Sequence, residues 1–156
     1  MFKSAGSGFW GKYISETGKS LSLLAHALDV ATVFRALCEV DAVRRSLASS
    51  TKTELTNEHL DRLAVLTMLH DIGKANLGFQ DKILPGQLGH VGHIQELAPL
   101  FGDEGLRTRF FKSLPPGTKT WFSNSDSADS YFFAIFSHHG RPVEFPERRT
   151  GHYWQA

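Results

Sequence analysis

The first long apolar segment of the chain has the spacing of an amphipathic helix. Over residues 21–47 apolar side chains recur at helical intervals, and no proline or glycine interrupts them. These positions include Leu23, Val30, Val33 and Leu37. His26 belongs to the same stripe, four residues before Val30. The pattern predicts one helix over residues 21–47 with a histidine on its apolar face.

A second helix is predicted after the polar stretch that ends at Thr56. The Thr56 hydroxyl is a suitable N-cap acceptor, and Glu58 places negative charge in the first turn. The inward face of this helix carries Leu63, Leu66, Thr67 and His70. Because glycine commonly follows a helix C-terminus, Gly73 predicts the end of this helix and places His70 and Asp71 in its last turn.

The remaining hydrophobic pattern predicts several shorter helices. The expected ranges are 77–84, 93–101, 104–114 and 127–138. The last of these is rich in aromatic residues, which also suits a strand, but its apolar positions have helical intervals. Phe132, Phe133 and Phe136 are expected in the core rather than as platforms for base stacking. After Gly140 the chain turns polar and proline-bearing, so residues 141–156 are expected to be an irregular tail.

Composition places the chain among ordinary globular proteins. It has 156 residues, of which 41% are hydrophobic and 21% charged, enough for one domain over residues 1–156. The single cysteine, Cys38, predicts a buried thiol and a reducing, cytoplasmic location. No apolar run approaches the roughly 20 residues of a membrane span, so we expect no membrane partner. A net charge of +1 implies that any attraction for phosphate is local.

Histidine is the unusual part of the composition, with eight residues in the chain. In sequence order, His26, the pair His70-Asp71, His93 and the pair His138-His139 each lie on or beside a predicted helix. Imidazole and carboxylate ligands suit divalent transition metals, and a carboxylate can bridge two ions. Asp71 is the candidate bridge and catalytic residue. Lys74, three residues later, is the other catalytic candidate, because its ammonium could contact a phosphate oxygen or, alternatively, carbonyls at the helix end.

Several of these histidines have less specific interpretations. His26 alone would more often be a satisfied core histidine. His90 competes with His93 as a ligand, since three residues separate the two on a helix. His138 and His139 point roughly 100° apart on a helix, so both reach one cluster only if the helix ends beside them, as Gly140 suggests. The two other histidines considered, His59 and His152, are expected to be solvated.

Short motifs in a fixed order resemble a known family. They are Trp10-Gly11-Lys12, Leu23-Leu24-Ala25-His26, His70-Asp71-Ile72-Gly73-Lys74, Phe79-Gln80, Gly92-His93 and Ser137-His138-His139-Gly140. This set resembles the HD phosphohydrolase superfamily and, within it, the nuclease domains of type I CRISPR-associated helicase-nucleases. The resemblance covers the chain from Trp10 to about Gly140.

The resemblance implies an all-α fold, the HD-domain helical bundle, without its last helices. It implies one ion held by His26, His70 and Asp71, and a second held by Asp71, His93, His138 and His139. The family carries a further ligand aspartate on a later helix. Asp126 and Asp129 precede the His138-His139 pair in the sequence, so neither is equivalent to that later aspartate. We therefore expect an N-terminal fragment of a longer helicase-nuclease.

The same resemblance implies a function. It is metal-dependent hydrolysis of single-stranded DNA in type I CRISPR interference, with two manganese, iron, cobalt or nickel ions. The expected partners are single-stranded DNA, a helicase domain or subunit, and a target-bound CRISPR surveillance complex. Two alternatives use the same residues differently: an HD phosphohydrolase of nucleotides or cyclic nucleotides, and a metal-free HD interaction module.

Overall fold

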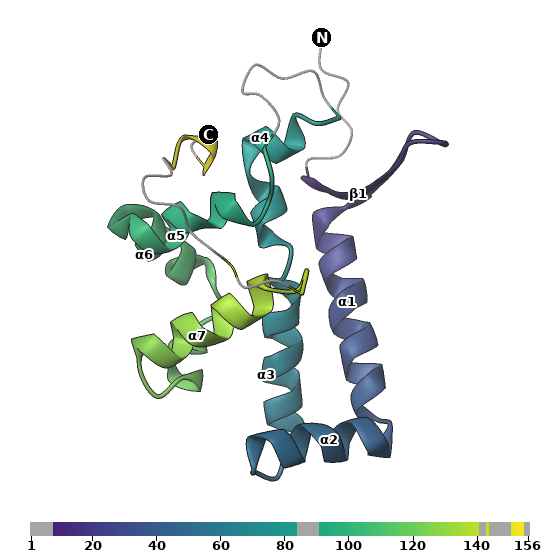
Figure 1. Ribbon diagram of the computed structural model, residues 1–156, viewed down its shortest axis with the longest axis vertical. Coiled ribbons are helices and arrows are strands. Elements are labelled where there is room, and N and C mark those ends of the chain that lie inside the picture. Colours follow the sequence, from purple (N-terminus) through teal and green to yellow (C-terminus); the bar gives the residue numbers. More distant parts are fainter. Residues whose placement is uncertain (1–7, 84–90, 141–142, 144–150, 155–156) are drawn as a thin grey trace.

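The chain is mainly helical, as predicted, with one small sheet near its N-terminus (Figure 1). The computed structural model describes residues 8–83, 91–140, 143 and 151–154. The sheet is an antiparallel hairpin of β1 (Trp10–Ile14) and β2 (Lys19–Ser22), which the hydrophobic pattern did not predict. The two strands have five and four residues and no regular alternation of buried and exposed side chains, so their sequence cannot be distinguished from that of a loop.

Helices α1 (Leu23–Cys38) and α3 (Asn57–Met68) pack side by side, and α2 (Asp41–Thr51) crosses their lower end in Figure 1. The prediction of one helix over residues 21–47 is wrong, because Val40 has extended backbone and starts a new helix. Helix α2 also continues through the first part of the polar stretch that was expected to be a separator.

The break after α1 follows from a small apolar cluster. Cys38 is fully buried against Leu55, which lies just before α3, and Leu60, which lies in the first turn of α3. A straight continuation of α1 would carry the chain away from this cluster, whereas the turn at Val40 folds α2 back across it. The burial of Cys38 is as predicted.

Helix α3 begins as predicted but ends earlier. The Thr56 hydroxyl accepts from the His59 N–H at 3.2 Å, and His59 Nδ1 accepts from the Thr56 N–H at 3.4 Å. This reciprocal capping leaves His59 half-buried rather than simply solvated. The helix ends at Met68, so His70 and Asp71 lie in the turn that follows it and not in its last turn.

Gly73 does not end α3, because it lies inside the short 3₁₀ helix η1 (Ile72–Ala75). Its role is close packing: a Cβ atom at this position would lie 1.7 Å from the backbone oxygen of His93. Glycine therefore lets the segment that carries His93 approach the segment that carries Asp71. The two candidate ligands meet only because this position has no side chain.

The second half of the chain forms a layer of short helices beside α3 (Figure 1). They are α4 (Leu77–Gln80), η2 (Gln95–Leu97), α5 (Ala98–Gly102), α6 (Glu104–Ser113), η3 (Thr118–Trp121), α7 (Ser125–Phe136) and η4 (Gly151–Trp154). The helices predicted over 104–114 and 127–138 are confirmed. The segment predicted from residue 93 becomes helical only at Gln95, so His93 precedes the helix.

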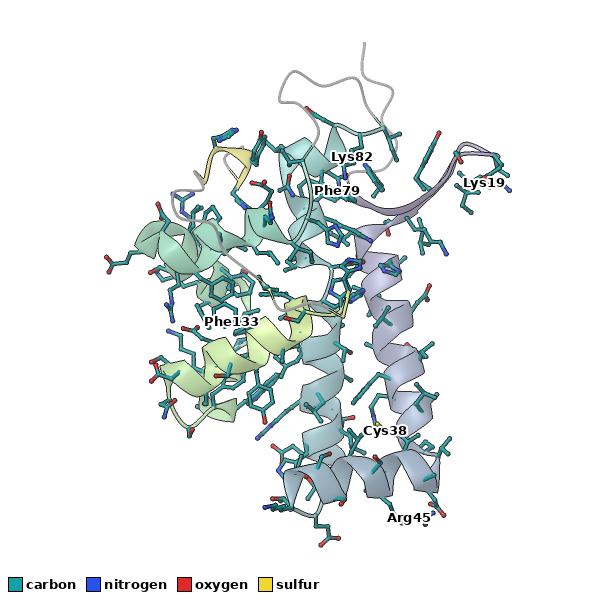
Figure 2. The ribbon with its side chains drawn as sticks, in the orientation of Figure 1. Lys19, Cys38, Arg45, Phe79, Lys82 and Phe133 are labelled. Atoms are coloured by element: carbon teal, nitrogen blue, oxygen red, sulfur yellow. The ribbon has the colours of Figure 1, made fainter. Side chains whose placement is uncertain are left out.

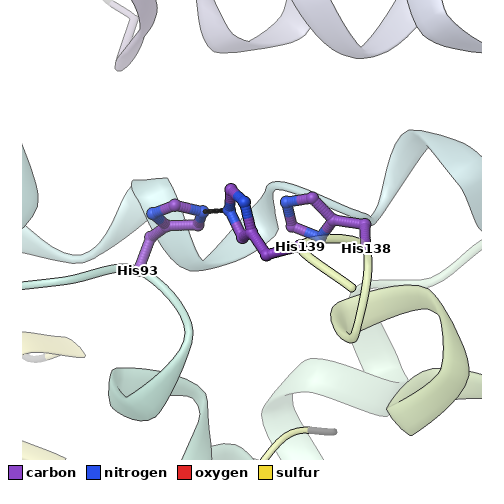
Figure 3. A group of neighbouring side chains, drawn as sticks. All are labelled: His93, His138 and His139. Atoms are coloured by element: carbon purple, nitrogen blue, oxygen red, sulfur yellow. Dashed lines mark hydrogen bonds between the residues drawn. The ribbon is translucent and has the colours of Figure 1, made fainter. Parts of the chain in front are cut away.

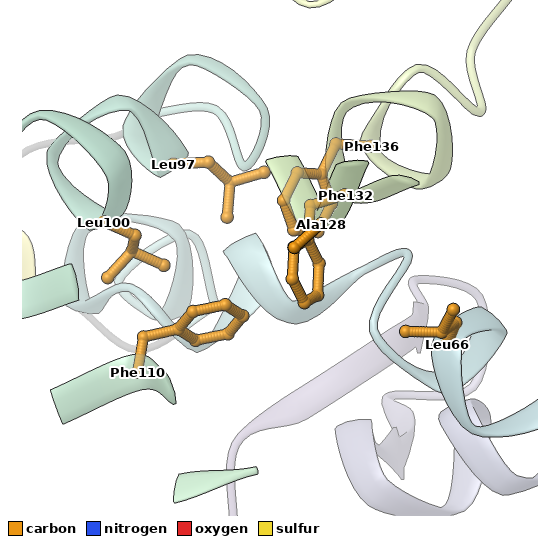
Figure 4. Close-up of a cluster of buried hydrophobic side chains, with 7 residues drawn as sticks. All are labelled: Leu66, Leu97, Leu100, Phe110, Ala128, Phe132 and Phe136. Atoms are coloured by element: carbon orange, nitrogen blue, oxygen red, sulfur yellow. The ribbon is translucent and has the colours of Figure 1, made fainter. Parts of the chain in front are cut away.

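The main core lies between α3 and this layer (Figure 4). Its buried side chains are Leu66, Leu97, Leu100, Phe110, Ala128, Phe132 and Phe136. Phe133 is the exception to the predicted core set, because 37% of its surface is exposed, although its ring lies 5.3 Å from that of Phe101 between centroids (Figure 2). In the expected irregular tail, Trp154 of η4 packs against the core and donates its indole N–H to the Glu96 carbonyl at 2.6 Å.

Across the described ranges, no helix combines the length and the apolar character needed to cross a lipid bilayer.

The close approach at Gly73 gives a direct test of this packing. Gly73→Ala should lower the free energy of unfolding by about 3 kcal/mol, since the added methyl group meets a backbone oxygen that cannot rotate away. Gly102→Ala is the matched control, because a Cβ atom there meets nothing within 4 Å. It should change stability by less than about 0.5 kcal/mol. Equal urea midpoints for the two variants would contradict this packing.

Candidate metal centre

Four separate segments bring the predicted ligands together beside the upper end of α3. His26 comes from the first turn of α1, and His70 and Asp71 come from the turn after α3. His93 precedes η2, and His138 and His139 follow the end of α7 at Phe136. The early end of α7 and the positive φ of Gly140 allow both adjacent histidines to reach the cluster, as the sequence required.

The first group of side chains surrounds one oxygen of Asp71. Oδ2 lies 3.0 Å from His26 Nε2 and 3.2 Å from His70 Nε2. The His70 ring is held from its other side, where Nδ1 lies 2.8 Å from the Thr67 carbonyl. In the neutral ring, donation from Nδ1 to this carbonyl leaves the Nε2 lone pair free to bind a cation.

The second group surrounds the other oxygen of the same carboxylate. His93 Nε2 and His138 Nε2 lie 3.3 and 3.4 Å from Asp71 Oδ1. His139 Nε2 lies 3.1 Å from His93 Nε2, and Figure 3 shows the three imidazole rings next to one another. Asp71 therefore has one oxygen toward each group of histidines.

The two groups have the spacing of metal-binding sites. The ligand atoms of His26, His70 and Asp71 lie within 4.8 Å of one another, and so do those of His93, His138 and His139. Nitrogen and carboxylate ligands without a thiolate are suited to divalent transition metals rather than to calcium or magnesium. This cluster could therefore bind metal.

Asp71 is both buried and ionised. Its side chain is 5% exposed, and burial by itself opposes ionisation. Interactions with His70, His93 and Lys74 outweigh burial and hold the pKa of Asp71 well below its usual range. Its Oδ1 atom nevertheless has only the longer contacts to His93 and His138, at 3.3 and 3.4 Å, and no hydrogen bond of normal geometry. A buried carboxylate oxygen without such a bond is costly, and a bound cation would satisfy it.

The same carboxylate and burial also shift the pKa values of two of the histidines. The hydrogen bond to Asp71 raises the pKa of His70, whereas burial lowers the pKa of His138. Both rings keep some contact with solvent, at 15% and 24% exposure of the side chain. His138 is thereby favoured in the neutral form that can bind a metal.

Lys74 belongs to the cluster, and its ammonium does not contact the helix-end carbonyls that were the alternative expected from the sequence. Its ammonium donates to Asp71 Oδ2 at 2.6 Å and to the Gly11 carbonyl at 3.0 Å. The second acceptor lies on the β-hairpin and not at the end of α3. The Trp10-Gly11-Lys12 motif was the one signal for this contact in the sequence, but sequence reasoning did not identify Lys74 as the partner of Gly11.

Other candidates lie outside the cluster. His152 packs against Tyr153 in η4, and Asp129 accepts two hydrogen bonds from Arg107 at 3.0 and 2.9 Å. Asp126 lies in the exposed first turn of α7. His90, the alternative to His93, lies outside the described residues.

Asn76 is a residue of the site that sequence reasoning missed. Its fully buried side chain donates to the Gly73 carbonyl at 2.7 Å and to the Gly92 carbonyl at 2.9 Å, and it accepts from the Phe79 N–H. It thus links the segment after Asp71 to the residue before His93. Only its position shortly after the His-Asp motif distinguishes it in the sequence.

Comparison with known proteins identifies the family. No curated protein and no solved structure gives a significant match to the chain. The family model described as "Cas3, HD domain" matches residues 10–156, a range that includes the hairpin and all six clustered His and Asp residues. The chain therefore belongs to the Cas3 HD-domain family.

Proposed function

We propose that the chain is a metal-dependent nuclease that hydrolyses phosphodiester bonds of single-stranded DNA. The observation that carries the proposal is the arrangement of Asp71, which directs one buried oxygen to each of two groups of histidines. Membership of the Cas3 HD-domain family supports the assignment to nucleases. A single carboxylate between two sets of imidazoles is suited to a two-ion centre.

In this proposal His26, His70 and Asp71 hold one ion, and Asp71, His93, His138 and His139 hold the other. Manganese, iron, cobalt and nickel fit this ligand set. When bound, two such ions supply Lewis acidity to the attacking and leaving oxygens of a phosphodiester. The chain itself contributes ligands held by distant segments, so that folding fixes the geometry before substrate arrives.

Lys74 is the proposed source of further positive charge. The Lys74 side chain is 16% exposed, and its ammonium lies 2.6 Å from Asp71 Oδ2, the oxygen that His26 and His70 also contact. In this position it keeps the carboxylate oriented, and its charge offsets negative charge that develops on a phosphate in the transition state. Lys74 is therefore proposed to act without binding metal.

Exposure of the second histidine group favours a polymer substrate. The His138 side chain keeps 24% of its surface exposed and the adjacent His139 is an exposed residue, whereas Asp71 is only 4% exposed. A site that opens at the surface suits a strand that passes across it better than a small molecule that must be enclosed. We propose single-stranded DNA as that strand, delivered by a helicase domain or subunit at a target-bound CRISPR surveillance complex.

Cleavage of circular single-stranded DNA tests this proposal. With manganese, cobalt or nickel, the protein should nick the circle, and Asp71→Ala should lower the rate by more than about 100-fold because both ion sites lose their shared ligand. Asp126→Ala, an exposed aspartate outside the cluster, should cleave as wild type. Equal cleavage by wild type and Asp71→Ala, or hydrolysis of deoxynucleotides with no cleavage of the circle, would contradict the proposal.

The number of bound ions tests the two ligand groups separately. Titration with Co²⁺ in a calorimeter should give two ions for wild type and about one for either His26→Ala or His93→Ala, since each substitution removes a ligand from one group only. His152→Ala should still bind two ions. Absence of transition-metal binding by wild type would favour a metal-free module instead.

A further inference from the structure

A second set of contacts joins the N-terminal hairpin to α4, beside the metal centre. The Gln80 side-chain amide accepts from the Trp10 backbone N–H at 2.9 Å and donates to the Trp10 carbonyl at 3.0 Å. A residue on a neighbouring antiparallel strand would make the same two bonds. Gln80 therefore acts as a one-residue partner for the free edge of β1.

The Trp10 side chain adds to this connection. Its indole N–H donates to the Gln80 backbone carbonyl at 3.1 Å, and its ring stacks on Phe79 with 4.7 Å between centroids. Phe79 also contacts the ammonium of Lys82, which is 4.4 Å from the Phe79 centroid (Figure 2). The hairpin is thus fixed to α4 by side chain and backbone together.

The same amide also reaches the loop of the metal centre. Gln80 Nε2 donates a second hydrogen bond to the Lys74 carbonyl at 2.6 Å, so both amide hydrogens and the amide oxygen have partners. Gln80 is 8% exposed, and its hydrogen bonds are shielded from competing water.

The hydrogen bonds of Gln80 restrict the position of the Lys74 side chain. Its ammonium donates to the Gly11 carbonyl, and Gly11 directly follows Trp10. Gly11 is closely packed, since a Cβ atom there would lie 2.8 Å from Leu23 Cα. Gln80 therefore holds the backbone at both ends of the Lys74–Gly11 hydrogen bond, through the Lys74 carbonyl and through the neighbouring Trp10.

We infer that Gln80 is a positioning residue of the metal centre, which holds the Lys74 ammonium between the Gly11 carbonyl and Asp71 Oδ2. The inference rests on the proposed function, because the role that it gives to Gln80 is to help orient the Asp71 carboxylate, the proposed bridge between two ions. Gln80 bonds the backbone of Trp10 and Lys74, and its effect on Asp71 passes through Lys74. A merely structural role would stabilise the fold without acting through Lys74.

The position of the Lys74 ammonium can be measured directly. In protein labelled with ¹⁵N-lysine, wild type should show a protected side-chain ammonium signal, assigned by its loss in Lys74→Arg. Gln80→Met keeps the side-chain volume but removes all three hydrogen bonds, and the signal should disappear. Leu60→Val, a destabilised control in the cluster at the far end of α3, should retain it. A signal unchanged in Gln80→Met would overturn the inference.

Gln80→Glu provides the same test if the methionine variant does not fold. It keeps the shape and the acceptor for the Trp10 N–H, but its ionised carboxylate cannot donate to the Trp10 and Lys74 carbonyls. The Lys74 ammonium signal should again disappear, and its retention would overturn the inference.

Metal affinity separates positioning from stability alone. Co²⁺ affinity should fall about 10-fold in Gln80→Met and in Lys74→Met, and the double variant should bind no more weakly than Lys74→Met. Wild-type affinity in Gln80→Met, or additive losses in the double variant, would overturn the inference. If wild type binds no Co²⁺, the proposed function fails, and the ammonium signal alone then decides whether Gln80 positions Lys74.

Discussion

The whole site depends on one buried carboxylate. Asp71 is almost completely enclosed, yet its neighbours keep it ionised and leave Oδ1 without a hydrogen bond of normal geometry. A buried charge of this kind is stable only where opposite charge surrounds it, which here means imidazoles, an ammonium and the cations that the cluster could bind. The helices, the glycine contact and the hairpin all serve to place these groups around one residue.

The His and Asp residues of this cluster could be identified from the sequence. Their order along the chain and the motifs around them indicated which histidines would meet, and all six predicted residues lie together. The prediction that α7 must end beside His138 and His139 also holds, because the adjacent Gly140 was a recognisable signal for that ending. For the ligand groups the information came from the family resemblance that these motifs carry, and for the end of α7 it came from a local pattern.

The features that were missed depend on contacts between distant segments. The break at Val40 follows from the burial of Cys38 against residues after α2, and periodicity within the helix cannot report that. Gly73 has the appearance of a helix terminator, although its function is to admit the backbone of His93. Likewise, Gln80 and Trp10 are separated by 70 positions, so nothing local predicts that an amide side chain would complete the edge of a hairpin.

The central claim is that Asp71 bridges two ions, one in each histidine group. The most direct measurement is electron paramagnetic resonance of the protein loaded with Mn²⁺. Two ions about 3.5–4 Å apart that share a carboxylate should give the spectrum of an exchange-coupled pair, and Asp71→Ala should abolish it. A spectrum of isolated Mn²⁺ ions in fully loaded wild-type protein would contradict the account.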